Sequence, residues 1–523
     1  MTYSHFIGGG VEDTHSLASS NFPLCPLRLS GQFQIKMPML YKIRQIATQY
    51  YRRPSDCFDL AIYVGFLLFA LILPFGYATL ILNASLLLVL FGWVGRTCHE
   101  RRFEWKRTPL DIPIAVFLLL ALVASLLAPH PATSSLGYFW KLLRAVLLFY
   151  AVVHSRLGDR WRHLIIAFVF AGGISSILGL YYYATGTHMG TAYMFDIEAR
   201  LESHFSDAAH RNEGVKVSAD LRQVYETNGR QLSQDATILP SKKYGDWLIV
   251  DKDQNRKYAV RKSEGQLKVY MIEPRLAGTF KMPNDLGAYL VIVLPIAIGY
   301  LVASWRVPRN WKLIAVLGIC VCTMGANLAL TLTRAAWIGV FAATLYIAIY
   351  FQRKLLWGLL AIALLSPFLM PQAVKDRFEV MRQRPSGFMS ERPQWWKTSA
   401  QLIAKYPITG IGLGRFRHEY QLHAPAGVHH KPYHTHNIYL HIAVEQGIPS
   451  LILFLGILFL IFRRLFALRK KDDFWCSGLF IGGSGFLISA LVYGLADQIL
   501  HQRPLLIFWF LVGLFFLCLG SRQ

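Results

Sequence analysis

Charged residues are scarce in this chain. They make up 16% of its 523 residues, whereas soluble proteins carry about a quarter. Acidic residues are the scarcer kind, with 30 Asp and Glu against 54 Lys and Arg, and the formal net charge is +24. Because 54% of the residues are hydrophobic and fall into many separate runs, the composition excludes an ordinary soluble protein and indicates an integral membrane protein.

Several common sites are also missing from the sequence. The seven cysteines show neither a disulfide framework nor zinc-site spacing. The His-Glu-x-x-His and Gly-x-Ser-x-Gly patterns do not occur, which argues against a zinc hydrolase and a serine hydrolase. The first 50 residues lack a basic cluster followed by an apolar core, so we expect no cleavable signal peptide.

Apolar segments alternate with polar links along the chain, and basic residues gather in every second link. This alternation follows the positive-inside rule, so we predict an all-α polytopic membrane protein with about twelve spans and both ends in the cytoplasm. Much of the net charge is then topological, and a nucleic-acid partner is not indicated. The spans are expected near residues 57–75, 77–95, 110–128, 138–155, 163–184, 285–304, 312–331, 335–351, 355–370, 437–462, 474–494 and 504–520.

The spans and links divide the chain into six parts. Two of the parts are long loops on the outer side of the membrane. The parts are a cytoplasmic tail at 1–56, five spans at 57–184, a first outer insertion at 185–274, four spans at 275–370, a second outer loop at 371–435, and three spans with a short cytoplasmic tail at 436–523.

The two outer loops differ in charge. Loop 185–274 carries 13 basic and 13 acidic residues, and its second half predicts a small β-meander with strands near 246–250, 257–261 and 268–272. Loop 371–435 carries 10 basic and 4 acidic residues, a surplus on the side where the positive-inside rule disfavours it. The surplus favours an anionic ligand, because arginine forks suit phosphate oxygens. Long loops also cross the membrane regardless of charge, so a merely basic loop stays open as an alternative.

Some cations lie within or beside the spans. Arg334 stands between two apolar runs, where a buried charge costs roughly 2.5–3.5 kcal/mol on insertion scales. It either snorkels to the lipid headgroups or faces a site below the basic loop. Lys141 and Arg144 either snorkel in the same way or meet Asp497. Arg275 precedes a turn shaped by Gly278 and Pro283, after which Asn284 can cap the following helix. An interfacial arginine at a capped helix entry and a site residue are equally compatible there.

His436 stands where the basic loop enters an apolar segment. A histidine at a dry membrane edge suits acid–base chemistry or hydrogen bonding to a substrate. The surrounding histidines lack cysteine company and have few carboxylates near them in the sequence, so we expect no metal here.

Five ordered segments resemble the bacterial O-antigen ligase and polymerase superfamily. The ordered combination is more specific than any single segment, and the resemblance covers about residues 57–520. The segments are Arg275-x-x-Gly-Thr-Phe-x-x-Pro-Asn284, Leu332-Thr-Arg334-x-x-Trp337, Ser390-Glu-Arg392-x-x-Trp395, Tyr406-Pro-Ile-Thr-Gly-Ile-Gly-Leu-Gly-Arg-Phe416 and His436-Asn437-x9-Gly447.

The resemblance implies a GT-C-type membrane glycosyltransferase in the bacterial inner membrane, with its active site facing the periplasm. Such an enzyme takes a glycan from undecaprenyl pyrophosphate and joins it to an acceptor, without metal or cofactor. By motif, Arg334 and Arg392 would hold the pyrophosphate, and His436 would assist the acceptor hydroxyl or the leaving group. Further residues expected to bind substrate are Arg275, Asn284, Glu391, Trp395, Arg415, Arg417, His434 and Asn437.

Within this family we predict an O-antigen ligase with lipid A–core as acceptor and the membrane lipids around it. An O-antigen polymerase and a protein O-oligosaccharyltransferase use the same donor, and the sequence does not show which acceptor is used. A transporter for an anionic lipid belongs to a different class. That alternative predicts charges in the middle of spans and internal repeats, which the sequence does not show.

Overall fold

The predicted tail at 1–56 and much of the first outer loop lie outside the residues that the structure describes. The computed structural model describes residues 54–101, 105–128, 133–185, 237–240, 247–251, 256–263, 266–272, 275–280, 282–305, 310–369, 375, 392–423, 432–470, 473–499 and 502–520.

A helix occupies the position of each predicted span. The helices are α2 (Pro54–Ile72), α3 (Thr79–Glu100), α4 (Asp111–Leu126), α5 (Thr133–Val153), α6 (Trp161–Thr185), α9 (Pro283–Ser304), α10 (Trp311–Leu330), α11 (Arg334–Tyr350), α12 (Lys354–Leu369), α16 (Ile438–Phe466), α17 (Phe474–Gly494) and α18 (Gln502–Gly520). Seven helices among the described residues are long and apolar enough to cross a membrane, and further apolar helices are shorter. A multi-pass helical membrane protein is thus supported, whereas the number twelve stays a prediction.

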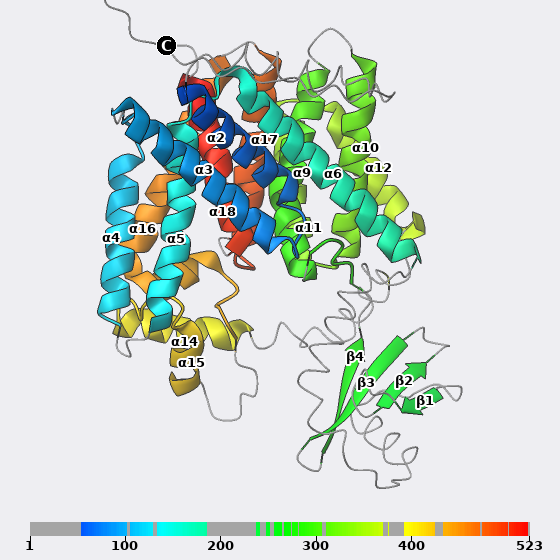
Figure 1. The fold of residues 1–523 in the computed structure, drawn as a ribbon. Coiled ribbons are helices and arrows are strands. Elements are labelled where there is room, and N and C mark those ends of the chain that lie inside the picture. The colour runs from blue at the N-terminus through cyan, green and yellow to red at the C-terminus, as the bar shows by residue number, and fades with distance from the viewer. Residues whose placement is uncertain are drawn as a thin grey trace, which may run out of the picture. The chain divides into compact units, whose positions relative to one another are not determined.

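Four strands form one antiparallel sheet within the first outer loop. They are β1 (Thr237–Pro240), β2 (Trp247–Asp251), β3 (Arg256–Ser263) and β4 (Gln266–Ile272), in the order β1-β2-β3-β4. The last three lie where the sequence predicts strands, and β1 is additional. Each strand pairs with the next one along the chain, for example Trp247 with Val260, so the sheet is a meander (Figure 1).

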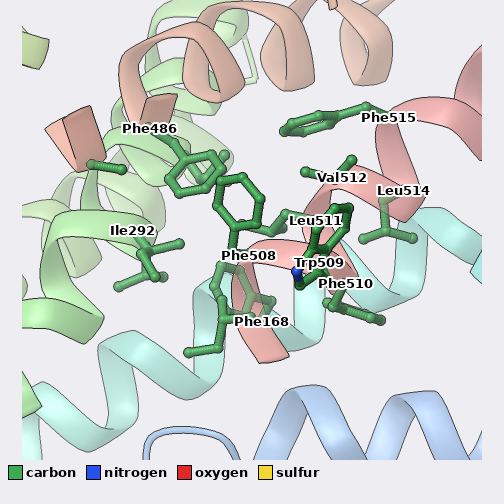
Figure 2. Packing of buried hydrophobic residues seen from close by; sticks show 14 of the residues in the cluster. Phe168, Ile292, Phe486, Phe508, Trp509, Phe510, Leu511, Val512, Leu514 and Phe515 are labelled. Atoms are coloured by element: carbon green, nitrogen blue, oxygen red, sulfur yellow. The ribbon is translucent and has the colours of Figure 1, made fainter. Parts of the chain in front are cut away.

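The helical core is built around α9, which is almost wholly enclosed by its neighbours. Apolar side chains from α6, α9, α17 and α18 meet there, among them Phe168, Ile292, Phe486 and Phe508 (Figure 2). α9 and α17 approach very closely through glycines, because a Cβ on Gly299 would lie 2.2 Å from the backbone nitrogen of Gly482. Small residues let membrane helices pack backbone to backbone, and this contact fixes the centre of the bundle.

Two short helices form in the second outer loop, where the sequence analysis assigns no element. They are α14 (Arg392–Lys405) and α15 (Phe416–His423). α14 packs against α16, and the link between α14 and α15 contacts Ala128 and Tyr138 at the ends of α4 and α5. Figure 1 shows α14 and α15 at the ends of α4, α5 and α16. The described part of the loop therefore sits on one end of the helices.

Replacing Gly299 by alanine should destabilise the bundle by about 1–3 kcal/mol, because the new methyl group overlaps the α17 backbone. Gly325 on α10 is the matched control, since a Cβ there meets nothing within 4 Å. Gly325→Ala should leave stability unchanged or raise it slightly through helix propensity. Thermal unfolding of both variants in one detergent measures the difference. Equal melting temperatures would contradict the close α9–α17 contact.

Candidate active site

The helix that follows the basic loop is broken near its start. In α16 the backbone at Gly447 leaves helical geometry, with φ 82° and ψ 169°. A Cβ at this position would lie 2.0 Å from the carbonyl oxygen of Ile408, so only glycine fits. The sequence predicts one continuous span near 437–462. The structure instead has a short half-helix at 438–446, followed after the break by a longer apolar helix.

The break frees backbone groups that the outer loop then uses. A continuous helix would keep these carbonyl and amide groups bonded within itself. Here the link between α14 and α15 pairs with them and lies directly against the broken helix. The bonds run from Ile411 N to Val444 O at 2.9 Å, from Gly412 N to Glu445 O at 3.0 Å, and from Ile448 N to Pro407 O at 2.8 Å.

A second hydrophobic cluster joins the half-helix to α14 and α15. It is separate from the membrane core and is fully buried, although it lies in a segment rich in polar residues. Its members are Trp395, Leu402, Ile411, Phe416, Tyr420 and Val444. This cluster and the backbone bonds together hold the loop, so the site rests on a packed support.

Asn437 fixes the start of the half-helix. Its side-chain oxygen accepts hydrogen bonds from the backbone nitrogens of Tyr439 at 3.0 Å and Leu440 at 3.1 Å, as an N-cap residue does. Its side-chain nitrogen donates to the carbonyl of Leu495 at 3.1 Å, just after α17. The spacing from Asn437 to Gly447 is therefore the distance between the two ends of the half-helix. The sequence predicts that Asn437 contacts substrate. In the structure its side chain bonds to the backbone of the protein, and these bonds position the neighbouring residue, His436.

His436 has an unusual backbone conformation, and two contacts hold its ring. Its backbone has φ 51°, a left-handed conformation that non-glycine residues rarely adopt. Its ring stacks on Trp395, with centroids 5.1 Å apart and planes at 27°. The Nδ1 atom lies 3.0 Å from Oδ1 of Asp497. Because an ionised carboxylate only accepts, Nδ1 carries a hydrogen, and in the neutral form of the ring the lone pair is then on Nε2.

Asp497 is the buried carboxylate of this pair. Its other contacts are the backbone nitrogen of Gln498 at 2.9 Å from Oδ1 and the hydroxyl of Tyr493 at 3.3 Å from Oδ2. Burial acts to raise the pKa of Asp497, but the hydrogen bond from His436 and the charges of His436 and His434 outweigh it and lower the pKa to about 2. Since this value is below the ordinary 3.8, the pairing stabilises the fold above about pH 4, and that contribution is lost as the pH falls toward 2.

The sequence analysis misses this role of Asp497. It names Asp497 as a possible partner of Lys141 or Arg144, but Arg144 donates to the side-chain oxygen of Asn83 at 3.4 Å. The ammonium group of Lys141 lies over the ring of Tyr138, 4.3 Å from its centroid. The available signal was an acidic residue isolated between the last two apolar segments. No local pattern links it to a histidine 61 positions earlier.

The helices that begin at the two arginines expected to hold pyrophosphate start in the same region. Arg392 donates from Nη1 to the carbonyl of Ala496 at 2.9 Å, one residue before Asp497. Arg334 begins α11, which packs antiparallel to α17: Gly339 faces Ser489, and Ile347 faces Gly485. If this pairing continues along the helices, the start of α11 lies beside the C-terminal end of α17. Asp497 follows that end of α17 by three residues, so Arg334 begins its helix near Asp497.

The expectation that Asn284 caps the following helix is wrong. The N-cap of α9 is Met282, without a side-chain cap, and Asn284 lies inside the first turn, where its side-chain oxygen accepts from Arg275 instead. The guanidinium of Arg275 donates to the Thr331 carbonyl at 2.9 Å, the Asn284 side-chain oxygen at 2.8 Å and the Thr333 hydroxyl at 3.0 Å. These bonds fix the short link between α10 and α11, in which Leu332 has φ 53°. The geometry therefore makes Arg275 a support for the position of Arg334.

The remaining predicted residues lie around α15. Arg415 is buried, with Nη2 3.3 Å from Nδ1 of His418 and 3.9 Å from the carboxylate of Glu419. Arg417 lies over the ring of Tyr433, 4.0 Å from its centroid. Glu391 falls outside the described residues. Arg415 thus stabilises α15, and Arg417 stacks on an aromatic ring in the loop that leads to His434.

His434 lies directly beside His436. The two ring centroids are 4.1 Å apart, and the backbone nitrogen of His436 donates to Nδ1 of His434 at 3.3 Å. One donor atom from each of His434, His436 and Asp497 lies within 4.8 Å of the other two. The site therefore combines a proton acceptor, fixed cations nearby, and a set of side chains able to coordinate a metal ion.

A comparison with protein families identifies the segment that carries most of these residues. Residues 318–455 match the family model described as O-antigen ligase. The match includes Arg334, Arg392, His436 and Gly447, whereas Asp497 lies beyond it. No curated protein matches the chain significantly. Residues 318–455 are therefore similar to O-antigen ligases, and this match supports the superfamily that the ordered segments of the sequence resemble.

Proposed function

We propose that this chain is an O-antigen ligase. It transfers a glycan from undecaprenyl pyrophosphate to lipid A–core at the periplasmic face of the bacterial inner membrane, on a GT-C-type scaffold with twelve spans. The family match supports a glycosyltransferase-like ligase or polymerase acting on lipid-linked glycans. The ligase reaction, the donor and the compartment are the further steps of the proposal.

The observation that carries the proposal is the convergence of a positioned histidine with arginines at one end of the helices. His436 pairs with Asp497, and Arg392 donates to the residue next to that aspartate. Arg334 begins a helix whose register leads to the same place. A pyrophosphate leaving group needs cations that cannot lose their charge, and a sugar hydroxyl needs a proton acceptor. Both are present in one region.

His436 would act on the acceptor. As a hydroxyl of lipid A–core attacks the anomeric carbon of the glycan, a new C–O bond forms and the bond to the pyrophosphate oxygen breaks. The hydroxyl proton passes to Nε2 of His436, and the Asp497 carboxylate stabilises the imidazolium that results. The side chain of His436 is 21% exposed, so the proton can then leave to water.

The arginines would act on the donor. The bond electrons pass to the pyrophosphate, and the guanidinium groups of Arg334 and Arg392 compensate the growing negative charge. The N-terminus of α11 adds its backbone N–H groups and dipole at the same place. Because these positive charges belong to the chain, we expect transfer without a metal cofactor.

Purified protein with lipid-linked glycan and separate acceptors tests the assignment. We expect product with lipid A–core and none with a second lipid-linked glycan or with a pilin-like protein. A lengthened lipid-linked glycan would instead identify a polymerase, and a glycosylated protein would identify a protein O-oligosaccharyltransferase. Movement of lipid across vesicles without any transfer would favour a transporter.

His436→Ala should lower transfer by about 10²- to 10⁴-fold, the usual contribution of a positioned general base. Expression and membrane insertion should be kept, because Asn437 still caps the half-helix. His423→Ala is the control. This histidine lies on α15, where its Nδ1 bonds to the carbonyl of Glu419, and among the described hydrogen bonds it has none to Asp497. Near-normal turnover of the His436 variant would remove this residue from the catalytic set.

Arg334→Lys and Arg392→Lys should each lose most of the activity that alanine removes. Lysine keeps the charge but not the bidentate fork. A lost charge-assisted contact costs about 2–5 kcal/mol, or roughly 30- to several-thousand-fold. Kinetics with varied donor and varied acceptor should place the loss in donor binding or turnover. Lys397→Ala, an exposed site on the same helix as Arg392, should behave as wild type. Normal activity of both Lys variants would make these arginines topological anchors.

A further inference from the structure

Three side chains, His436 among them, form a group able to bind a metal ion, a property that the proposed transfer reaction does not use. His434, His436 and Asp497 come from two segments, the loop before α16 and the link after α17. One donor atom of each lies within 4.8 Å of the others, and the His436–Asp497 pair is already at 3.0 Å. With metal bonds of roughly 2.0–2.2 Å to nitrogen and oxygen, two donors on one ion lie about 3–3.5 Å apart. The separation between His436 and Asp497 is therefore already close to that of two ligands of the same ion.

The donors suit a particular class of ion. Two imidazoles and one carboxylate are ligands typical of zinc and neighbouring transition metals, whereas Ca²⁺ and Mg²⁺ prefer oxygen alone. The Asp497 carboxyl is ionised at neutral pH, as its low pKa requires. The side chains of His436 and Asp497 are 21% and 8% exposed, so an ion can enter from the outer face and be largely enclosed. Asp497 itself is held in place by Tyr493 and Gln498.

We propose that His434, His436 and Asp497 form an inhibitory binding site for a divalent transition-metal ion such as Zn²⁺, with water completing the coordination. The ion is not a cofactor of the transfer reaction. Metal binding stands on the geometry alone, and the inhibition rests on the proposed role of His436 as proton acceptor.

The inhibition follows from the chemistry of imidazole. A neutral ring has one free lone pair, and the hydrogen bond to Asp497 places it on Nε2. An ion bound through Nε2 occupies that lone pair directly. An ion bound through Nδ1 displaces the Nδ1 proton, and the neutral ring then carries its hydrogen on Nε2. In both cases His436 can no longer accept the proton of the acceptor hydroxyl.

Direct binding to the full-length protein is the first test. The protein is stripped with EDTA, and Zn²⁺ is titrated against a chromophoric chelator; Co²⁺ then reports nitrogen and oxygen ligands by its visible absorption. We expect the wild type to bind one ion more than Asp497→Asn and His434→Ala, or to bind it at least about tenfold more tightly. Asp497→Asn keeps the shape of the side chain, so a loss there is not a folding defect. His423→Ala should bind as wild type. Equal binding by wild type and both site variants would overturn the site.

Transfer assays are the second test. Micromolar Zn²⁺ should reduce transfer by the wild type at least about tenfold, and EDTA should restore it fully. Stimulation by Zn²⁺, or loss of transfer in EDTA with recovery on adding one ion, would overturn the inhibitory role. If the protein transfers no glycan to any acceptor, the binding titration still decides whether the site exists. Failure of the proposed function and failure of the metal site are therefore distinguishable.

Discussion

A membrane helix that keeps all its backbone hydrogen bonds offers no bonding groups to an outer loop, and α16 gives up that continuity at Gly447. The carbonyls of Val444 and Glu445 then accept amides from the link between α14 and α15. These bonds hold the link between α14 and α15 against the half-helix that follows His436. A side chain at Gly447 would collide with the backbone of Ile408, and the loop could not reach these groups.

The half-helix also gives the described part of the polar loop a packed position at one end of the helices. Its outward side joins Trp395 and Phe416 in a small hydrophobic cluster of its own. Trp396 adds a hydrogen bond from its ring nitrogen to the carbonyl of Thr435 at 3.0 Å, directly before His436. Reactive side chains need support from packed neighbours to stay within a narrow range of geometry. Here that support comes from aromatic residues of α14 and α15.

Charge at the site is divided between groups that titrate and groups that do not. A buried carboxylate is costly unless it is paired, and Asp497 is paired with His436 and two further donors. The arginines keep their charge at any physiological pH, so they suit a leaving pyrophosphate. In the proposed reaction the same pairing prepares His436 as a proton acceptor, and it also leaves the ring able to bind a metal ion. One lone pair serves either role, and the two exclude each other.

Much of the helical layout follows from local patterns. Each apolar segment, for example 285–304, is a helix because hydrophobic runs of that length satisfy their backbone only in that form within a bilayer. The strand positions in the first outer loop follow from β-branched and aromatic runs such as Trp247–Val250. His436 and Arg334 were accessible as candidates because each is a polar residue at an apolar boundary, whereas Arg392 lies within the basic loop and was a candidate only through the family resemblance.

The sequence by itself determined that this is a helical membrane protein with a segment similar to O-antigen ligases and a histidine at a loop–helix junction. Only the tertiary structure decided that Asp497 is the partner of His436, that Arg275 supports the link before Arg334, and that α16 is broken at Gly447. The reason is physical: hydropathy and turn chemistry are local properties of the chain. Pairing between residues 61 positions apart depends on how α16 and α17 pack, and no local pattern carries that information.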